Sequence, residues 1–342
     1  MSTIGVPFAL PWLAFVVCWL VFGWGATALH ALAGRALARL APDQRGAVLL
    51  ALALAPLACG VAVAVLGFVP LAGGHFVDAH CHAEIGCRPH VPILEAEMTL
   101  AVLLVFGIAA WSVIAWRSVA TGVREGRGLA LALERLARPA AGADAGRAIA
   151  SSISDKGGFS RTVPAVAVIE SDAAFAYCTG VLRPRVVVSR ALVDRLTPRQ
   201  LEIVLAHEHA HAARYDNLRR VVAGIGLRLA PARPRRALLK DLALAAELTC
   251  DAEAAHRAGS ADAVVETLRA LHALPRAVSG DGPVPSGPEA IAVRVAALSG
   301  GPFRRLPSWW LAVIAAAAFT AVTLPAVRFA HHAVEALLGW TG

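Results

Sequence analysis

The chain has 342 residues, of which 57% are hydrophobic and 16% are charged, and its mean hydropathy is +0.62. A soluble globular domain usually has about 25% charged residues, so this composition disfavours a soluble protein and predicts a membrane protein. The formal net charge of +8 fits loops that face anionic lipid. Because no nucleic-acid-binding motif accompanies this charge, we expect the lipid bilayer to be a partner and expect no direct binding of nucleic acid.

Four stretches of the chain contain no Asp, Glu, Lys or Arg: residues 1–34, 46–77, 98–116 and 306–327. Each stretch is long enough to cross about 30 Å of hydrocarbon at about 1.5 Å per helical residue. Buried core helices are the alternative interpretation, but four such stretches in one chain disfavour it. We therefore predict transmembrane helices at about 8–33, 47–74, 96–116 and 306–328.

The loops between these helices differ in charge. Arginines gather between the first two predicted helices, after the third and before the fourth, whereas residues 78–97 carry four acidic residues and one arginine. By the positive-inside rule, residues 117–305 form a cytoplasmic domain and residues 75–95 form an outer loop. Both termini, including the tail at 329–342, are then expected outside.

The predicted outer loop contains two cysteines six positions apart, Cys81 and Cys87, among several histidines. On an oxidising side of the membrane they can form a small disulfide loop. The same residues can instead bind a soft or borderline metal such as copper or zinc. Both interpretations stay open at this point, and a signal received here could reach the cytoplasmic domain through the third helix.

The cytoplasmic region predicts a mixture of strands and helices. Short strands are expected at residues 163–170, 174–178 and 185–189. A helix should follow, because Thr197 can cap it, Pro198 suits its first position and Gln200 completes a capping box. Further helices are expected at 236–258, ending at Gly259, and after Ser260. Residues 138–162 and 278–288 are predicted linkers, and the short stretch 221–231 can lie on the bilayer but cannot span it.

The helix after Thr197 carries the pattern H-E-x-x-H at residues 207–211. Residues four apart lie one turn apart on the same helix face, so His207 and His211 can bind one Zn²⁺ ion. Glu208 is offset around the helix and can take a proton from the attacking water, whose pKa zinc lowers. His209 points to another face and is interpreted as a packing or surface residue.

A catalytic zinc ion needs a third protein ligand and an open position for water. Glu247 lies in the next long helix, among Ala and Leu residues, and is the predicted third ligand. Asp251, one turn later, can accept a hydrogen bond from a ligand histidine and fix its tautomer. Asp216 is a second candidate for such support. Cys250 is interpreted as a small buried residue.

These motifs resemble a known family. Residues 206–216 and 247–251, together with the run 178–189, resemble the bacterial BlaR/MecR-type antirepressor membrane zinc metallopeptidases. The resemblance implies four transmembrane helices with an α+β zincin-like metallopeptidase domain inserted between the third and the fourth. It also implies that residues 185–189 form the edge strand that pairs with an extended substrate.

By the same resemblance, one catalytic Zn²⁺ ion is bound by His207, His211 and Glu247, with Glu208 as the base. One feature departs from the family. The sequence ends at Gly342, which leaves no room for the extracellular penicillin-binding sensor domain, and no S-x-x-K acylation site lies in an outer segment. We therefore expect the peptidase module without beta-lactam sensing.

The leading hypothesis is a multi-pass zinc endopeptidase of the bacterial inner membrane that hydrolyses peptide bonds of a cytoplasmic or membrane-proximal protein. The resemblance implies a transcriptional repressor as substrate and a role in signal transduction. Membrane-protein quality control is the alternative enzyme function. A non-catalytic metal-sensing receptor is the alternative of another class, and Glu208 argues against it because a structural zinc site has no need of that carboxylate.

Overall fold

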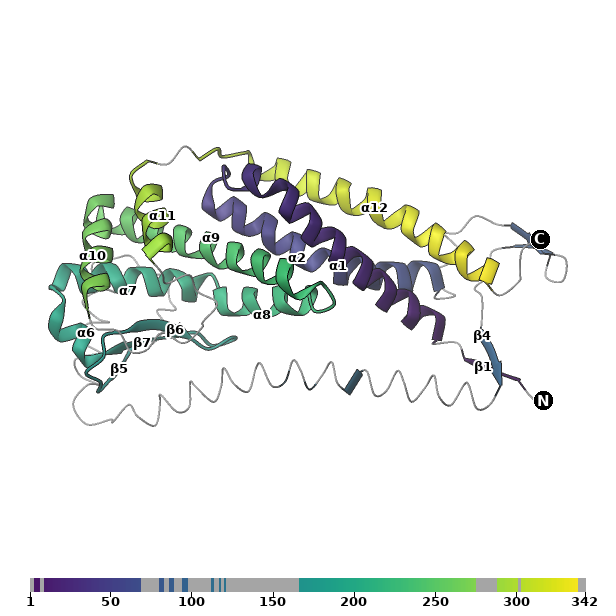
Figure 1. Ribbon diagram of the computed structural model, residues 1–342, viewed down its shortest axis with the longest axis horizontal. Helices are drawn as coiled ribbons and strands as arrows, with labels where there is room; N and C mark the ends of the chain where they lie inside the picture. Colours follow the sequence, from purple (N-terminus) through teal and green to yellow (C-terminus); the bar gives the residue numbers. More distant parts are fainter. Residues whose placement is uncertain are drawn as a thin grey trace.

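Three long helices run side by side in the computed structural model, α1 (Ala9–Leu37), α2 (Pro42–Phe68) and α12 (Ser308–Leu337) (Figure 1). The structure describes residues 3–6, 9–68, 80–82, 86–88, 94–97, 112–113, 117, 120, 166–274, 288–300 and 303–337. Within these residues, three helices, at Ala9–Leu37, Pro42–Phe68 and Ser308–Val334, are long and apolar enough to cross a membrane. The helix predicted at 96–116 falls almost wholly outside the described residues.

The membrane helices pack closely. A Cβ atom on Gly60 of α2 would lie 2.9 Å from the carbonyl oxygen of Phe15 in α1, so a residue without a side chain is needed at this crossing. Val327 of α12 is fully buried in a cluster with Val63 and Phe68 of α2. The helix α12 continues to Leu337, so the first part of the tail expected at 329–342 is helical.

Short strand pairs lie near the end of the helix bundle where α1 begins and α12 ends (Figure 1). The strand β1 (Thr3–Val6) pairs antiparallel with β4 (Leu94–Glu97). In the predicted outer loop, β2 (His80–His82) pairs antiparallel with β3 (Gly86–Arg88), and Cys81 lies opposite Cys87 in the backbone register. The side chains of this loop lie outside the described part of the chain, so the disulfide and the metal site both stay predictions.

The α+β region contains a three-stranded sheet of β5 (Val166–Ile169), β6 (Ala176–Thr179) and β7 (Arg185–Ser189). Its order is β5-β7-β6, with β7 parallel to β5 and antiparallel to β6. The prediction that residues 185–189 form the edge strand is therefore wrong: β7 is central, and β6 lies at the edge. The reason is visible in the run Val186–Val188, which is buried on both faces as a central strand requires.

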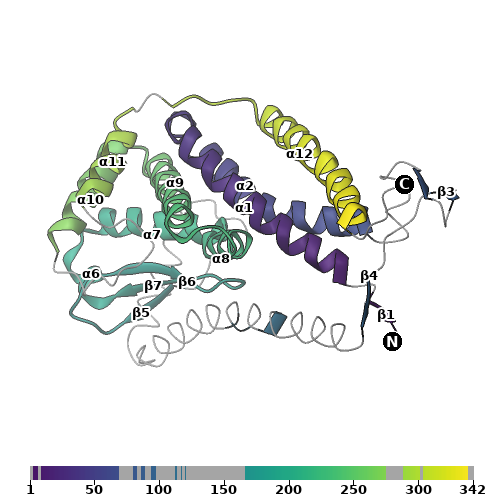
Figure 2. The same cartoon turned by 45° about the vertical axis from the view of Figure 1, so that its right-hand side comes forward.

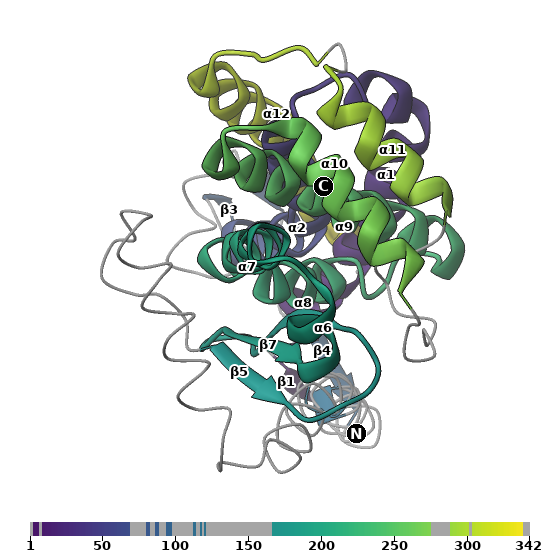
Figure 3. The same ribbon diagram turned by 90° about the vertical axis from the view of Figure 1, so that its left-hand side faces the viewer.

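Helices follow this sheet along the chain, and they include the three that the sequence predicts after Thr197, up to Gly259 and after Ser260. The short helix α6 (Arg190–Arg195) leads into α7 (Pro198–Ala213), where Thr197 and Gln200 form the predicted capping box. The helix α9 (Ala232–Ala258) ends at Gly259 in the left-handed conformation, and Ser260 caps α10 (Ala261–Ala273). A further helix, α11 (Pro288–Leu298), follows the predicted linker. Figures 1 and 3 show α7 between the sheet and the helices α9 to α11.

The α+β region is docked directly on the membrane helices (Figure 2). The helix α8 (Asp216–Gly226), the turn that follows it and α9 share a buried apolar cluster with α1 and α2: Ala26, Leu49, Ala53, Ala223, Leu227, Ala230, Leu238, Leu242 and Ala245. The indole nitrogen of Trp19 in α1 donates a hydrogen bond of 2.6 Å to the carbonyl of Gly226. Residues 221–231, expected near the bilayer, thus lie against α1 and α2.

Candidate metal centre

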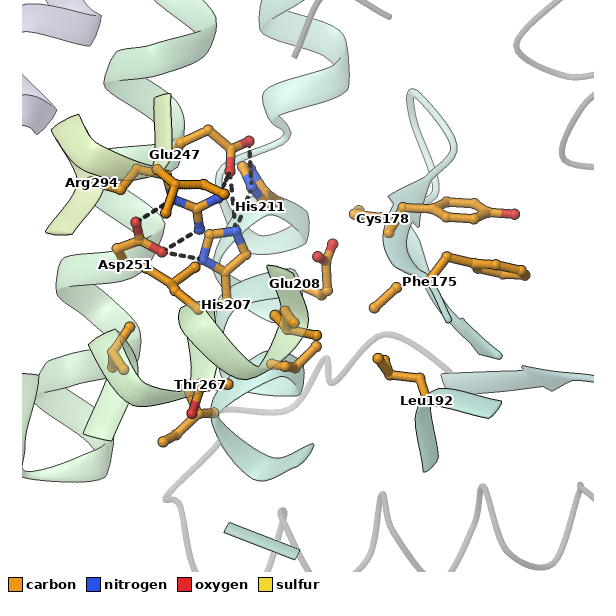
Figure 4. Close-up of a pocket in the computed structure, with 18 of the residues that line it drawn as sticks. Phe175, Cys178, Leu192, His207, Glu208, His211, Glu247, Asp251, Thr267 and Arg294 are labelled. Atoms are coloured by element: carbon orange, nitrogen blue, oxygen red, sulfur yellow. Dashed lines mark hydrogen bonds and ion pairs between the residues drawn. The ribbon is translucent and has the colours of Figure 1, made fainter. Parts of the chain in front are cut away.

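Two neighbouring helices bring three possible metal ligands together. The helix α7 places His207 and His211 one turn apart, and α9 places Glu247 opposite them (Figure 4). The two Nε2 atoms are 3.2 Å apart. One oxygen of Glu247 lies 3.5 Å from Nε2 of His207, and the other lies 3.4 Å from Nε2 of His211. The structure therefore brings the three residues predicted as ligands together, with their possible donor atoms within 4.8 Å of one another.

These spacings fit a zinc ion. Tetrahedral zinc with bonds of about 2.0–2.2 Å to nitrogen and oxygen separates neighbouring ligand atoms by about 3.3 Å. The three observed separations lie between 3.2 and 3.5 Å. Two imidazoles and one carboxylate also form the ligand set of catalytic zinc sites, which leave the fourth position open. The residues present thus suit zinc by distance and by chemistry.

A second layer of carboxylates orients the two histidines. Asp251 accepts a hydrogen bond of 2.9 Å from Nδ1 of His207 when that nitrogen carries a proton, and Asp216 does the same for Nδ1 of His211 at 2.9 Å. Both carboxylates are buried. A proton held on Nδ1 leaves the lone pair of Nε2 free for a metal, and the rings cannot rotate. The structure thus brings Asp251 and Asp216 to the supporting positions predicted for them.

Electrostatics at the site follow from this packing. Burial raises the pKa of Glu247, but hydrogen bonds from His207 and His211 outweigh that effect and hold the pKa well below its usual range. Burial lowers the pKa of His211, whereas its hydrogen bonds with Asp216, Cys250 and Glu247 raise it well above the usual value. Glu247 is thus stabilised as a negative carboxylate by positive charge at the histidines. A cation bound between these side chains would stabilise the carboxylate in the same way.

Arg294 of α11 is a site residue that the sequence analysis missed. Its Nε and Nη2 atoms each donate a hydrogen bond of 2.6 Å to Asp251, and its Nη1 lies 3.2 Å from Glu247. Burial alone would lower the pKa of Arg294, but the hydrogen bonds to Asp251 and the carboxylate charges nearby together outweigh burial and raise it. The guanidinium therefore stays charged. Arg294 thereby neutralises Asp251, which would otherwise be a second buried negative charge beside Glu247. A single arginine in the apolar helix 288–298 is the signal that could have indicated a buried partner.

Glu208 faces a cleft beside the histidines. Glu208 is 9% exposed, and Figure 4 shows its carboxylate between the histidine pair and the strand that carries Cys178. The cleft has a volume of about 420 Å³. Residues 174–178, which lead into and include most of the edge strand β6, form one wall, and α10 and α11 contribute to the other. Many of the lining side chains are apolar: Phe175, Leu192, Ile203, Val204, Val264, Leu268, Leu271 and Ile291. The Glu208 carboxylate, the three possible ligands and an open volume therefore share one cavity.

The remaining side chains near the centre are suited to packing. Cys250 is fully buried, its Sγ lies 3.7 Å from Asp216, and burial raises its pKa to about 11, so it stays a thiol at neutral pH. It lies beside Asp216, the carboxylate that binds Nδ1 of His211. His209 is 2% exposed and lies in the core of α7, in agreement with its interpretation as a packing residue.

Comparison with known proteins agrees with this geometry. Residues 145–233 match the model of Peptidase family M48. The match includes His207, Glu208, His211 and Asp216, and it supports a zinc metallopeptidase. It stops before α9 supplies Glu247 and before α11 supplies Arg294, and it does not single out the BlaR/MecR type. A search of curated proteins gives no match.

Proposed function

We propose that this chain is an integral-membrane, zinc-dependent endopeptidase that hydrolyses peptide bonds of a cytoplasmic or membrane-proximal protein. The observation that carries the proposal is the tetrahedral spacing of His207, His211 and Glu247 beside a cleft that Glu208 faces. The match to a peptidase family supports the reaction class, and three apolar helices support the membrane location.

Each residue of the centre has a role in this reaction. His207, His211 and Glu247 would hold one zinc ion, which when bound polarises a peptide carbonyl and makes water more acidic. Glu208 takes a proton from the attacking water in the cleft and delivers it to the leaving nitrogen. Asp251 and Asp216 keep the two imidazoles in the tautomer and orientation that ligation needs.

The edge strand suggests how a substrate binds. The strand β6 pairs with β7 along one side, and its other side borders the cleft through residues 176–178. An extended peptide can add to such an edge by main-chain hydrogen bonds, while its side chains enter the apolar part of the cleft. Asn217 fixes the end of β6 by donating hydrogen bonds of 3.0 and 3.1 Å to the carbonyls of Cys178 and Gly180. Unfolded or extended segments are therefore the substrates that the site favours.

A signalling role is favoured by the contact between the membrane helices and α9. Asp241 of α9 pairs with His30 of α1 and Arg45 of α2, and the same helix supplies Glu247 less than two turns later. A displacement of α1 or α2 can thus reach a metal ligand through one rigid helix. We accordingly propose signal transduction, such as inactivation of a transcriptional repressor, in the bacterial inner membrane, with the peptidase region cytoplasmic and both termini outside. Membrane-protein quality control is the second candidate, since the cleft accepts extended chains.

The test is proteolysis by the purified full chain and its Glu208→Gln variant, both loaded with matched zinc. Glu202→Gln, an exposed glutamate on the same helix, is the matched control. We expect Glu208→Gln to abolish self-cleavage and cleavage of an unfolded model protein while zinc content is unchanged, and the control to cleave normally. Equal cleavage by Glu208→Gln would contradict the mechanism. Retained zinc without cleavage in any of the three proteins would favour the non-catalytic metal-sensing receptor.

A further inference from the structure

The segment from α8 into α9 is strongly basic. Between Asn217 and Lys240 the chain carries seven basic residues and no acidic one. Four of the seven lie at the turn and the start of α9: Arg228, Arg233, Arg235 and Arg236. Arg228, Arg233 and Arg236 are exposed, and Arg235 is half-buried. We call residues 216–240 the α8–α9 hairpin.

Three of these arginines, Arg228, Arg235 and Arg236, lie close together. Nη1 of Arg235 donates a hydrogen bond of 2.9 Å to the carbonyl of Arg228. Burial lowers the pKa of Arg235, and so do the positive charges of Arg228 and Arg236 nearby. In the described part of the chain, no carboxylate forms an ion pair with any of the four arginines. Like charges gathered in this way are stabilised by an anion from outside the chain.

The position of the hairpin indicates where that anion comes from. A Cβ atom on Gly226 would lie 2.2 Å from the carbonyl oxygen of Ala53, so the hairpin touches the backbone of α2. Ala53 lies about 12 Å along α2 from Arg45, inside the stretch of that helix without charged residues. Beside the hairpin, Ala230 approaches Gly23 of α1, and the neighbouring Trp24 is 59% exposed. The hairpin therefore lies beside the segments that lipid surrounds.

We propose that Arg228, Arg233, Arg235 and Arg236 form a binding site for the phosphate of an anionic phospholipid. Long arginine side chains at this level can extend toward the phosphate layer while their stems stay against apolar surface. Clusters of four or more basic residues next to a membrane helix attract anionic headgroups. The site anchors the hairpin, and with it the start of α9, to the leaflet that faces the α+β region. It is separate from the metal centre and does not depend on peptidase activity.

The test is lipid binding by the full chain in a non-ionic detergent, counted by native mass spectrometry. The probes are phosphatidylglycerol, phosphatidylcholine as the neutral lipid, and inorganic phosphate. In R228Q/R233Q/R236Q we expect the affinity for phosphatidylglycerol to fall by roughly 100-fold, because each arginine near a lipid surface contributes a factor of about five. The matched control R183Q/R195Q/R199Q removes three exposed arginines elsewhere and should bind as the unchanged protein does.

Three results would overturn the proposal. Equal losses in the two triple variants would mean that net charge alone attracts the lipid. An unchanged affinity in R228Q/R233Q/R236Q would place the lipid elsewhere, and binding of inorganic phosphate as tight as that of the lipid would indicate a soluble anion. Should the triple variant fail to fold, Arg236→Gln against Arg199→Gln carries the same test, with an expected loss of about fivefold.

Discussion

Helix α9 contributes carboxylates to two clusters that also contain histidine, and the two clusters have different chemistry. In the first, Asp241 binds Nε2 of His30 at 2.9 Å and Nη2 of Arg45 at 3.1 Å, so both of its oxygens are already paired with side chains of α1 and α2. In the second, carboxylates bind the Nδ1 atoms, and the Nε2 atoms of His207 and His211 converge at 3.2 Å. A metal site therefore needs converging lone pairs, whereas a histidine next to an aspartate can equally be a structural link.

Among the changes that test this difference between the two clusters, removal of the proposed third ligand, Glu247, should have the largest effect. Glu247→Gln keeps the shape of the side chain but replaces the anionic oxygen that faces the histidines. We expect zinc affinity to fall by more than the roughly 10- to 100-fold typical of a lost outer-shell partner. Competition with a chelator measures this, with Glu253→Gln, an exposed glutamate of the same helix, as the control. Unchanged zinc binding in Glu247→Gln would remove Glu247 from the ligand set.

Loss of an orienting carboxylate should have the next largest effect. Asp216→Asn retains a hydrogen-bond acceptor for Nδ1 of His211 but removes the charge that fixes the tautomer. Zinc affinity should fall by about 10- to 100-fold, with cleavage reduced in step at limiting zinc. Asp194→Asn, which removes an exposed carboxylate, is the control. Tight zinc binding in Asp216→Asn would show that the ring of His211 is held by packing alone.

Sequence reasoning could predict which side chains come together at this site where local spacing determines the geometry. The one-turn separation of His207 and His211 and the capping box at Thr197 follow from helix periodicity, and Glu247 stood out as an acid in an apolar helix. Arg294 was missed because it contacts Asp251, a residue 43 positions earlier in the chain and in another helix. The edge strand was misplaced because the resemblance outweighed the plainer signal of three consecutive valines. The docking on α1 and α2 depends on close backbone contact, which no periodicity encodes.

A third prediction concerns the contact between α8 and the membrane helix α2. In Gly226→Ala the new Cβ would lie 2.2 Å from the carbonyl oxygen of Ala53, so α8 must move away from α2. We expect a loss of stability of about 1–3 kcal/mol, as for other overpacked contacts. Gly224→Ala is a stringent control, since nothing lies within 4 Å of its Cβ and a helical alanine should be neutral or slightly stabilising. Equal unfolding midpoints in detergent for the two variants would contradict the close packing.

The smallest effect is expected from the cluster at Asp241. Asp241→Asn removes the charge that pairs with His30 and Arg45, but Asp241 is 31% exposed, so water compensates in part. We expect a loss of stability of about 1 kcal/mol. Lys240→Gln, the exposed neighbour, serves as the control in the same thermal unfolding measurement. Zinc affinity should fall far less than in Asp216→Asn, because the carboxylate of Asp241 is bound to groups of α1 and α2 and can act on the ligands only through α9. If Asp241→Asn instead weakened zinc binding as much as Asp216→Asn, the two clusters would be coupled through α9. Displacement of the membrane helices would then be able to control whether the metal centre is assembled.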